Sequence, residues 1–140
     1  MFEVFEHTAD LGIRARARSL EELFAEAARG LIAQLANLDA VQRVSEKSIE
    51  LASDSLEYLL FDWLSELLYA FEESRLLLSE FDVQIKQTGE EFKLRAVARG
   101  EVADAARHEL DHEVKAITYH GLLVEQQPGG DWLAEVIVDI

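Results

Sequence analysis

Acidic residues stand beside apolar runs near both ends of the chain. The closing run Val-Ile-Val-Asp-Ile, residues 136–140, holds Asp139 one position from the end, and the segment 7–12, His-Thr-Ala-Asp-Leu-Gly, holds Asp10. Because chain ends usually fray, an apolar strand that reaches the last residue suggests an end built into the fold. If both segments meet in one sheet, Asp10, Asp139 and the terminal carboxylate offer oxygen ligands to a hard cation. The alternative is two exposed turn acids without a ligand.

A second candidate site is the stretch His-Glu-Leu-Asp-His at residues 108–112. It matches H-E-x-x-H, in which two histidines one helical turn apart bind zinc and the glutamate is the general base. A zinc peptidase holds this motif in a substantial helix, whereas Val114, Ile117 and Thr118 favour a strand directly afterwards. The third ligand would have to be His120 or a distant acid. We therefore interpret the stretch as two surface histidines on a short acidic turn, with a zinc metallopeptidase as the weaker alternative.

Two further groups of basic residues lie in strand-like runs. In residues 114–121, alternation places Lys115 on one side of the chain and His120 on the other. Near a carboxylate cluster these side chains would orient a phosphate or a partner's acid; the alternative is ordinary solvated residues. Arg14, Arg16 and Arg18 alternate with apolar residues, and we interpret them as a solvated strand face rather than an anion-binding surface.

Composition narrows the classes of function. With 140 residues, 49% of them hydrophobic, the chain is predicted to form one compact domain over residues 1–140. A net charge of −15 disfavours direct binding of nucleic acid, which needs clustered lysine and arginine, and favours cations or basic protein partners. The absence of cysteine is compatible with a reducing cytosol, and the sequence contains neither a membrane-spanning run nor a signal-peptide pattern. Without a phosphate loop or an activated nucleophile, the sequence indicates a binding or activating protein rather than an enzyme.

The elements that must position these residues follow from hydrophobic periodicity. Two amphipathic helices are expected, at 20–36 after a capping box of Ser19 and Glu22, and at about 55–73 after Asp54 and Glu57. A short helical turn is one option for residues 104–112. The predicted strands are 2–5, 13–17, 44–52, a hairpin within 81–98 that turns at Thr88-Gly89, 114–124 and 132–140. Packing both helices on one antiparallel or mixed sheet gives an α+β sandwich.

Four segments, taken in order, resemble the archease family. They are H-T-A-D-L-G at 7–12, L-F-D-W-L-S-E-L-L-Y at 60–69, V-K-A-I-T-Y-H at 114–120 and V-I-V-D-I at 136–140. The likeness covers essentially the whole chain. It implies a small cytoplasmic α+β protein that assists an RtcB-type RNA ligase. Such a ligase joins 2′,3′-cyclic phosphate or 3′-phosphate ends of RNA to 5′-hydroxyl ends in tRNA splicing or RNA repair.

The resemblance also implies how the partner is assisted. The ligase acts through a histidine that is guanylylated with GTP and manganese, and archease promotes this step and multiple turnover without joining RNA itself. The implied cation ligands are Asp10, Asp139 and main-chain oxygen of Ile140. We expect calcium there, with magnesium or manganese as alternatives, because oxygen ligands accept several ions. The expected activation surface comprises three further residues: Lys115, His120 and His7.

A second class of function also agrees with the acidic charge. A chaperone-like modulator of nucleic-acid-processing enzymes would affect the solubility or assembly of several clients rather than one guanylylation step. Metal analysis separates both classes from the peptidase, which would retain zinc rather than an oxygen-ligated cation.

Overall fold

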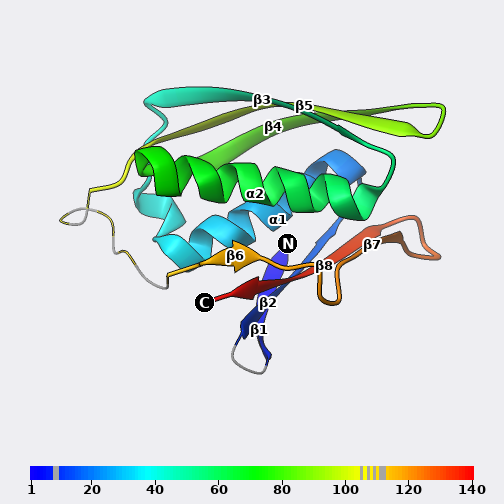
Figure 1. The fold of residues 1–140 in the computed structure, drawn as a ribbon, viewed down its shortest axis with the longest axis horizontal. Helices are drawn as coiled ribbons and strands as arrows, with labels where there is room; N and C mark the ends of the chain where they lie inside the picture. Colours follow the sequence, from blue (N-terminus) through cyan, green and yellow to red (C-terminus); the bar gives the residue numbers. More distant parts are fainter. Residues whose placement is uncertain (8–9, 105, 107, 109, 111–112) are drawn as a thin grey trace.

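Two helices lie between two antiparallel sheets in the computed structural model, which describes residues 1–7, 10–104, 106, 108, 110 and 113–140 (Figure 1). The helices are α1 (Leu20–Leu35) and α2 (Leu56–Ser74), and a 3₁₀ turn, η1 (Leu38–Ala40), follows α1. The five-stranded sheet comprises β1 (Phe2–His7), β2 (Asp10–Ala17), β6 (Ala116–Ile117), β7 (Leu123–Gln126) and β8 (Trp132–Asp139). The three-stranded sheet comprises β3 (Ser45–Ser53), β4 (Leu76–Thr88) and β5 (Glu91–Val102).

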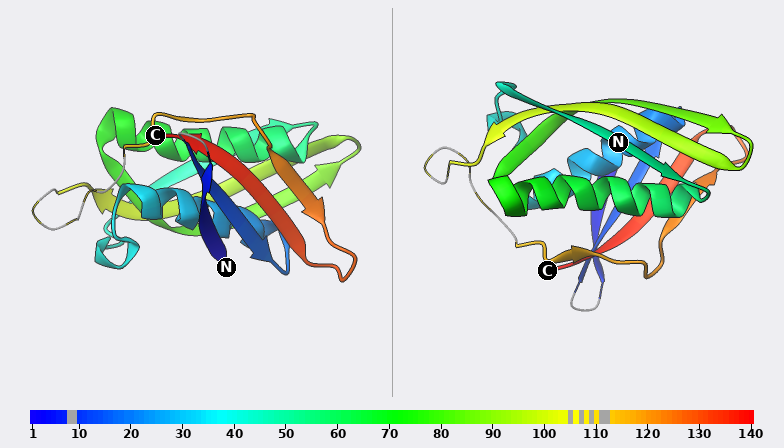
Figure 2. Two further views of the ribbon diagram at one scale, coloured as in Figure 1. Left: turned by 90° about the horizontal axis from the view of Figure 1, so that it is seen from below. Right: turned by 45° about the horizontal axis from the view of Figure 1, so that its top comes forward.

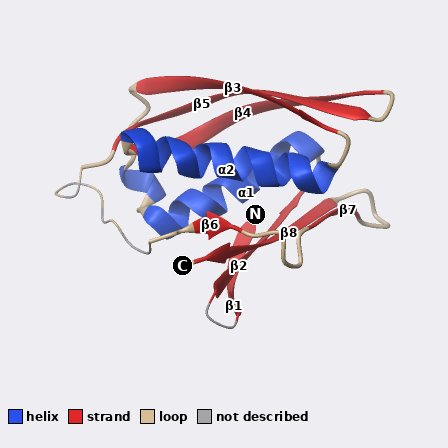
Figure 3. Ribbon diagram, viewed as in Figure 1, coloured by secondary structure: helices blue, strands red, loops and turns tan. Residues whose placement is uncertain are grey.

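The predicted α+β class is confirmed, but the strands form two sheets where one was expected (Figure 3). The burial of α1 gives the physical reason, because ten of its 16 residues are buried. A helix that packs on one sheet needs only one apolar stripe, whereas one buried on several sides needs cover from two layers. The five-stranded sheet covers α1 through β2, and the three-stranded sheet covers it through β4 (Figure 2).

Both helices begin at a serine that caps the first turn. The Ser19 Oγ accepts a hydrogen bond of 3.1 Å from the Glu22 main-chain N–H, as the capping box predicts. In α2 the cap is Ser55, whose Oγ accepts from the Tyr58 N–H at 3.3 Å, so the assignment to Asp54 was wrong by one residue. Two adjacent residues with capping side chains are indistinguishable by type, and only the helical register decides between them.

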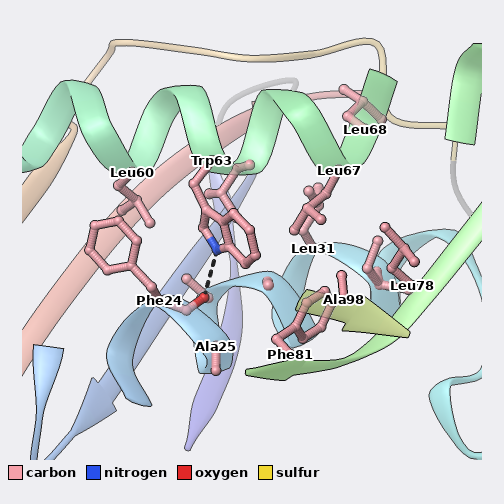
Figure 4. Packing of buried hydrophobic residues seen from close by; sticks show 14 of the residues in the cluster. Phe24, Ala25, Leu31, Leu60, Trp63, Leu67, Leu68, Leu78, Phe81 and Ala98 are labelled. Atoms are coloured by element: carbon pink, nitrogen blue, oxygen red, sulfur yellow. Dashed lines mark hydrogen bonds between the residues drawn. The ribbon is translucent and has the colours of Figure 1, made fainter. Parts of the chain in front are cut away.

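The centre of the core joins the two helices to the three-stranded sheet. Trp63 of α2 is fully buried, and its indole Nε1 donates a 3.0 Å hydrogen bond to the main-chain oxygen of Phe24 in α1 (Figure 4). Its ring meets Phe81 of β4 edge-on, with centroids 5.8 Å apart. A buried indole N–H costs free energy unless it is bonded, so this contact fixes how the two helices pack. Among the described residues, no helix is long and apolar enough to cross a membrane.

The final strand occupies the middle of the five-stranded sheet. β8 pairs with β2 along one edge and with both β6 and β7 along the other. The single strand expected at 114–124 is therefore wrong: it is two short strands that share one partner. Residues 118–122 loop out between them, turning at Gly121, which has a φ of 65°. Strand-forming side chains dominate this run, but the positive φ that glycine allows interrupts the extended backbone.

Candidate cation site and activation surface

Asp10 and Asp139 lie directly opposite each other at one end of the β2–β8 pair. Asp10 is the first residue of β2 and Asp139 the last of β8, and Leu11 and Val138 form the next pair in register. Directly opposite residues share one face of a sheet, with Cβ atoms about 4.5–5.5 Å apart. The structure thus brings together the two acids that were singled out at opposite ends of the chain, while cation binding stays a prediction.

Alternation along each strand fixes the face on which these carboxyls lie. Ile13 and Val138 are fully buried on the side of the sheet that carries the core. Asp10 is an odd number of residues from Ile13, and Asp139 is next to Val138, so both acids lie on the opposite, outer face. Both are half-buried, so their carboxyl groups remain within reach of solvent.

Main-chain groups of β6 and of Ile140 lie next to Asp139. β6 places Ala116 opposite Asp139, and the Lys115 N–H donates a 2.7 Å hydrogen bond to the Asp139 carbonyl oxygen. Ile140 follows directly, and its partly buried side chain packs against the core, which holds its main chain beside Asp139. The neighbouring oxygens are therefore fixed by sheet pairing and by packing.

This donor set fits a hard cation. Carboxylate and carbonyl oxygens are the ligands that calcium, magnesium and manganese prefer, and thiolates, which soft metals favour, do not occur in the chain. Over the described part of the chain, histidines and acids form no group of three or more side chains arranged for a metal. A cation at this site would therefore take two carboxylates from Asp10 and Asp139 and complete its coordination with main-chain oxygen and water.

A glycine shapes the same outer face, and the sequence analysis did not single it out. Gly12 lies opposite Phe5 in the β1–β2 register, and a Cβ on Gly12 would lie 2.1 Å from Phe5 Cζ. The Phe5 ring thus occupies the space above the glycine, and the Arg14 guanidinium lies 4.7 Å from the centre of that ring. An isolated glycine in a strand was the available signal, since it often marks a close approach.

Two of the three alternating arginines, Arg14 and Arg16, are paired with acids within the sheet. Arg14 donates to Glu135 of β8 at 2.8 Å and to Glu3 of β1 at 3.1 Å, and Arg16 donates to the same Glu3 oxygen at 3.2 Å. The hydrogen bond from Arg14 lowers the pKa of Glu3, and the bond to Glu135 raises the pKa of Arg14. This network ties β1, β2 and β8 together across their outer face, so Arg14 and Arg16 are not a vacant anion site.

The three residues expected on the activation surface occupy different places. Lys115 is exposed beside Asp139, and the main chain of His7 lies opposite Asp10 in the β1–β2 register. His120 lies beyond the end of β6, in the loop before Gly121, where its N–H donates to Thr118 Oγ1 at 3.3 Å. The register therefore places the Lys115 and His7 backbones at the acid pair, whereas His120 lies on the loop.

The interpretation of residues 108–112 as a surface turn is wrong for His108, which is 0% exposed. Its Nδ1 accepts a 2.8 Å hydrogen bond from the Asp104 N–H, so the proton is on Nε2, which contacts Glu101 Oε1 at 2.7 Å. Glu101, 4% exposed, also accepts from the Gln42 N–H at 3.0 Å. Both ring nitrogens of His108 are occupied, which leaves no lone pair for zinc. Glu109, Asp111 and His112 lie outside the described residues.

The fold and the site together define an α+β protein in which two helices lie between two antiparallel sheets and two acids pair at the end of a central strand. The model of the archease protein family (MTH1598/TM1083) matches residues 2–140. This chain belongs to the archease family.

Individual relatives agree with this assignment over nearly their whole length. The chain is 40% identical over 139 residues to protein archease of Pyrococcus abyssi, covering 99% of this chain and 98% of that one. It is 42% identical to protein archease of Methanopyrus kandleri, covering 99% of each. The solution structure of Methanobacterium thermoautotrophicum protein 1598 matches the fold with a TM-score of 0.88 at 33% identity, covering 99% of this chain and 98% of that one.

Proposed function

We propose that this protein activates an RtcB-type RNA ligase, promoting guanylylation of the ligase and multiple turnover in tRNA splicing or RNA repair. The observation that carries the proposal is the in-register pairing of Asp10 with Asp139 on the outer face of the sheet. Membership of the archease family supports the choice of partner, because this role is the one that the resemblance implies. The protein acts in the cytoplasm and contributes no catalytic nucleophile of its own.

In this proposal the acid pair holds a divalent cation, calcium first and magnesium or manganese otherwise. When bound, the cation supplies a positive charge that attracts and orients phosphate oxygens. Asp10 and Asp139 bind it through carboxylates, and Ile140 adds main-chain oxygen. Lys115, whose main-chain N–H bonds to the Asp139 carbonyl and whose side chain is exposed, attracts a phosphate or an acidic group of the partner.

The contribution of the chain is therefore one of positioning. Phosphoryl and nucleotidyl transfer depend on an in-line arrangement of the attacking group and the leaving group, so a second protein accelerates them by holding the reactants in place. A protein with a net charge of −15 is attracted to a cationic, nucleotide-binding active site and repelled by free RNA. Both effects favour docking on the ligase over competition with it for substrate.

The test is a guanylylation assay with purified RtcB-type ligase, GTP and manganese, scored for the ligase–GMP adduct. Asp10→Ala and Asp139→Ala are expected to lose most of the stimulation, whereas Asp82→Ala, which removes an exposed acid from β4 in the other sheet, retains it. Circular dichroism and thermal unfolding establish that each variant folds. Full stimulation by both folded site variants would defeat the proposal.

A further inference from the structure

Three aromatic rings form an exposed cluster where α2 meets the loop after β6. The Tyr119 ring stacks on Phe61 of α2, with centroids 3.9 Å apart and planes 11° apart. It meets Tyr58, one turn earlier on α2, edge-on at 5.5 Å. Even so, Tyr58 is 54% exposed and Tyr119 is 59% exposed. These three rings, which we call the aromatic cluster, thus pack against one another; the two tyrosine rings keep a large part of their surface in solvent, and Phe61 is partly buried against the core.

The loop that carries Tyr119 is fixed by hydrogen bonds. The N–H and the Oγ1 of Thr118 both donate to the Ile137 carbonyl oxygen at 3.0 Å, and the Leu122 N–H donates to the Tyr119 carbonyl oxygen. Ile137 belongs to β8, the central strand of its sheet. The exposed rings are therefore held in place, so a partner would lose little conformational entropy on contacting them.

The helix that supports the cluster carries negative charge alone. α2 contains five acidic residues and no lysine or arginine between Leu56 and Ser74. Asp62 and Glu66 follow Tyr58 at one-turn spacings, which places them on the same stripe of the helix. Tyr69, 57% exposed, continues the stripe, and its hydrogen bond to Glu73 raises its pKa. One side of α2 is covered by neither sheet (Figure 1), and Tyr58 and Tyr69 of this stripe are exposed.

Exposed aromatic rings beside carboxylates select a particular type of ligand. A guanidinium stacks on tyrosine and phenylalanine rings and pairs with carboxylates at the same time, a combination for which arginine is better suited than lysine. Nucleobases also stack on such rings, but their phosphates would meet five acids on the supporting helix. Charge complementarity therefore favours a protein over RNA.

We propose that the aromatic cluster, with Asp62 and Glu66, is a docking surface for an arginine-bearing segment of a protein partner. The surface adjoins the acid pair through the sheet: Ala116 lies opposite Asp139, and Thr118, next to Tyr119, bonds to Ile137 of the same strand. The docking surface and the acid pair thus both border β8, the central strand of the five-stranded sheet. The identification of that partner with the RNA ligase rests on the proposed function; the docking surface itself does not.

The first experiment uses a synthetic arginine-rich peptide as the probe and follows main-chain amide shifts of the labelled protein by NMR. The largest shifts are expected along α2 and at residues 118–120. Asp62→Lys is expected to weaken binding by roughly fivefold to tenfold, because it replaces attraction by repulsion at the surface. Its matched control is Glu90→Lys, which changes the net charge equally at an exposed position in the turn between β4 and β5 and is expected to change affinity by less than about twofold.

A second variant separates aromatic contact from charge. Tyr58→Leu keeps an apolar residue that favours helix but removes the π face, and a loss of about threefold in affinity is expected. Equal weakening by Asp62→Lys and Glu90→Lys would overturn the proposal, because binding would then follow net charge alone. Tighter binding of a short single-stranded RNA than of the peptide at the same residues would also overturn it.

The ligase assay then distinguishes failure of this inference from failure of the proposed function. Asp62→Lys and Tyr58→Leu should raise the concentration needed for half-maximal stimulation and leave the plateau unchanged, whereas Asp139→Ala should lower the plateau. If the unaltered protein gives no stimulation, the proposed function fails and the peptide result still decides the docking surface. If stimulation occurs and neither surface variant shifts the half-maximal concentration, the docking surface is wrong as the ligase contact.

Discussion

Two acidic sites in this fold differ in the burial and the hydrogen bonding of their carboxylates. Glu101, near the end of β5, is buried and bonded to the ring of His108 and to the Gln42 main chain. Asp10 and Asp139 are half-buried and lie in register on the outer face of the other sheet. A buried charge must be satisfied by the protein, whereas two like charges side by side are tolerated where solvent or a ligand reaches them. The first site serves the fold, and the second is suited to binding.

The largest expected effect comes from breaking the buried pair. His108→Ala leaves Glu101 buried without the imidazole and should lower the free energy of unfolding by about 3–5 kcal/mol. The guanylylation stimulated per folded molecule should be unchanged, since His108 lies outside the acid pair. Urea unfolding measures the loss, and Glu90→Ala in the exposed β4–β5 turn serves as a control with little effect. An unchanged midpoint would show that Glu101 and His108 do not stabilise the fold.

The acid pair, by contrast, should contribute to stability only when a cation is bound. A cation that binds only the folded state stabilises it by about 2.7 kcal/mol at a concentration one hundred times its Kd. Calcium should therefore raise the Tm of the unaltered protein, and EDTA should reverse the shift. Asp139→Asn should abolish the calcium-dependent shift, whereas Asp82→Asn should retain it. A shift that persists in Asp139→Asn would place the cation elsewhere.

The outer face can also be disturbed through its packing. Gly12→Ala brings a Cβ to 2.1 Å from Phe5 Cζ, and relief of this clash should cost about 1–3 kcal/mol of folding free energy. In the Gly12→Ala background, Phe5→Ala removes the clashing ring. It should therefore cost less folding free energy there than it does in the unaltered protein. A double-mutant cycle in urea measures this coupling. Strictly additive effects would mean that the ring and the glycine do not share this space.

The smallest effect concerns the exposed ion pairs of Glu3. Its pKa in the folded protein is lowered from an ordinary value of 4.5, chiefly by the hydrogen bond from Arg14. The ionised form therefore stabilises the fold above pH 4.5, and this stabilisation is lost as the pH falls through the lowered pKa. The unaltered protein should exceed Glu3→Gln slightly in stability at pH 7, and the difference should vanish near pH 2. A difference independent of pH would exclude ionisation as its cause.

Local features of the fold could be predicted because they depend on residues close in sequence. The Ser19 cap, the apolar stripe of α2 and the turn at Gly89 follow from short-range hydrogen bonding, periodicity and backbone freedom. The ends of the helices and strands were predicted less accurately. For example, β4 begins at Leu76, directly after α2, whereas the pattern suggested a strand only from Phe81.

What the sequence by itself determined was the two amphipathic helices, most of the strand-forming runs, and the two acids, Asp10 and Asp139, near the ends of the chain. The tertiary structure alone decided that β8 pairs with β2, that the strands divide between two sheets, and that His108 is buried against Glu101. The physical reason is that strand pairing and the burial of a polar side chain depend on partners far away in the chain. Periodicity records which face of an element is apolar, but it does not record what covers that face.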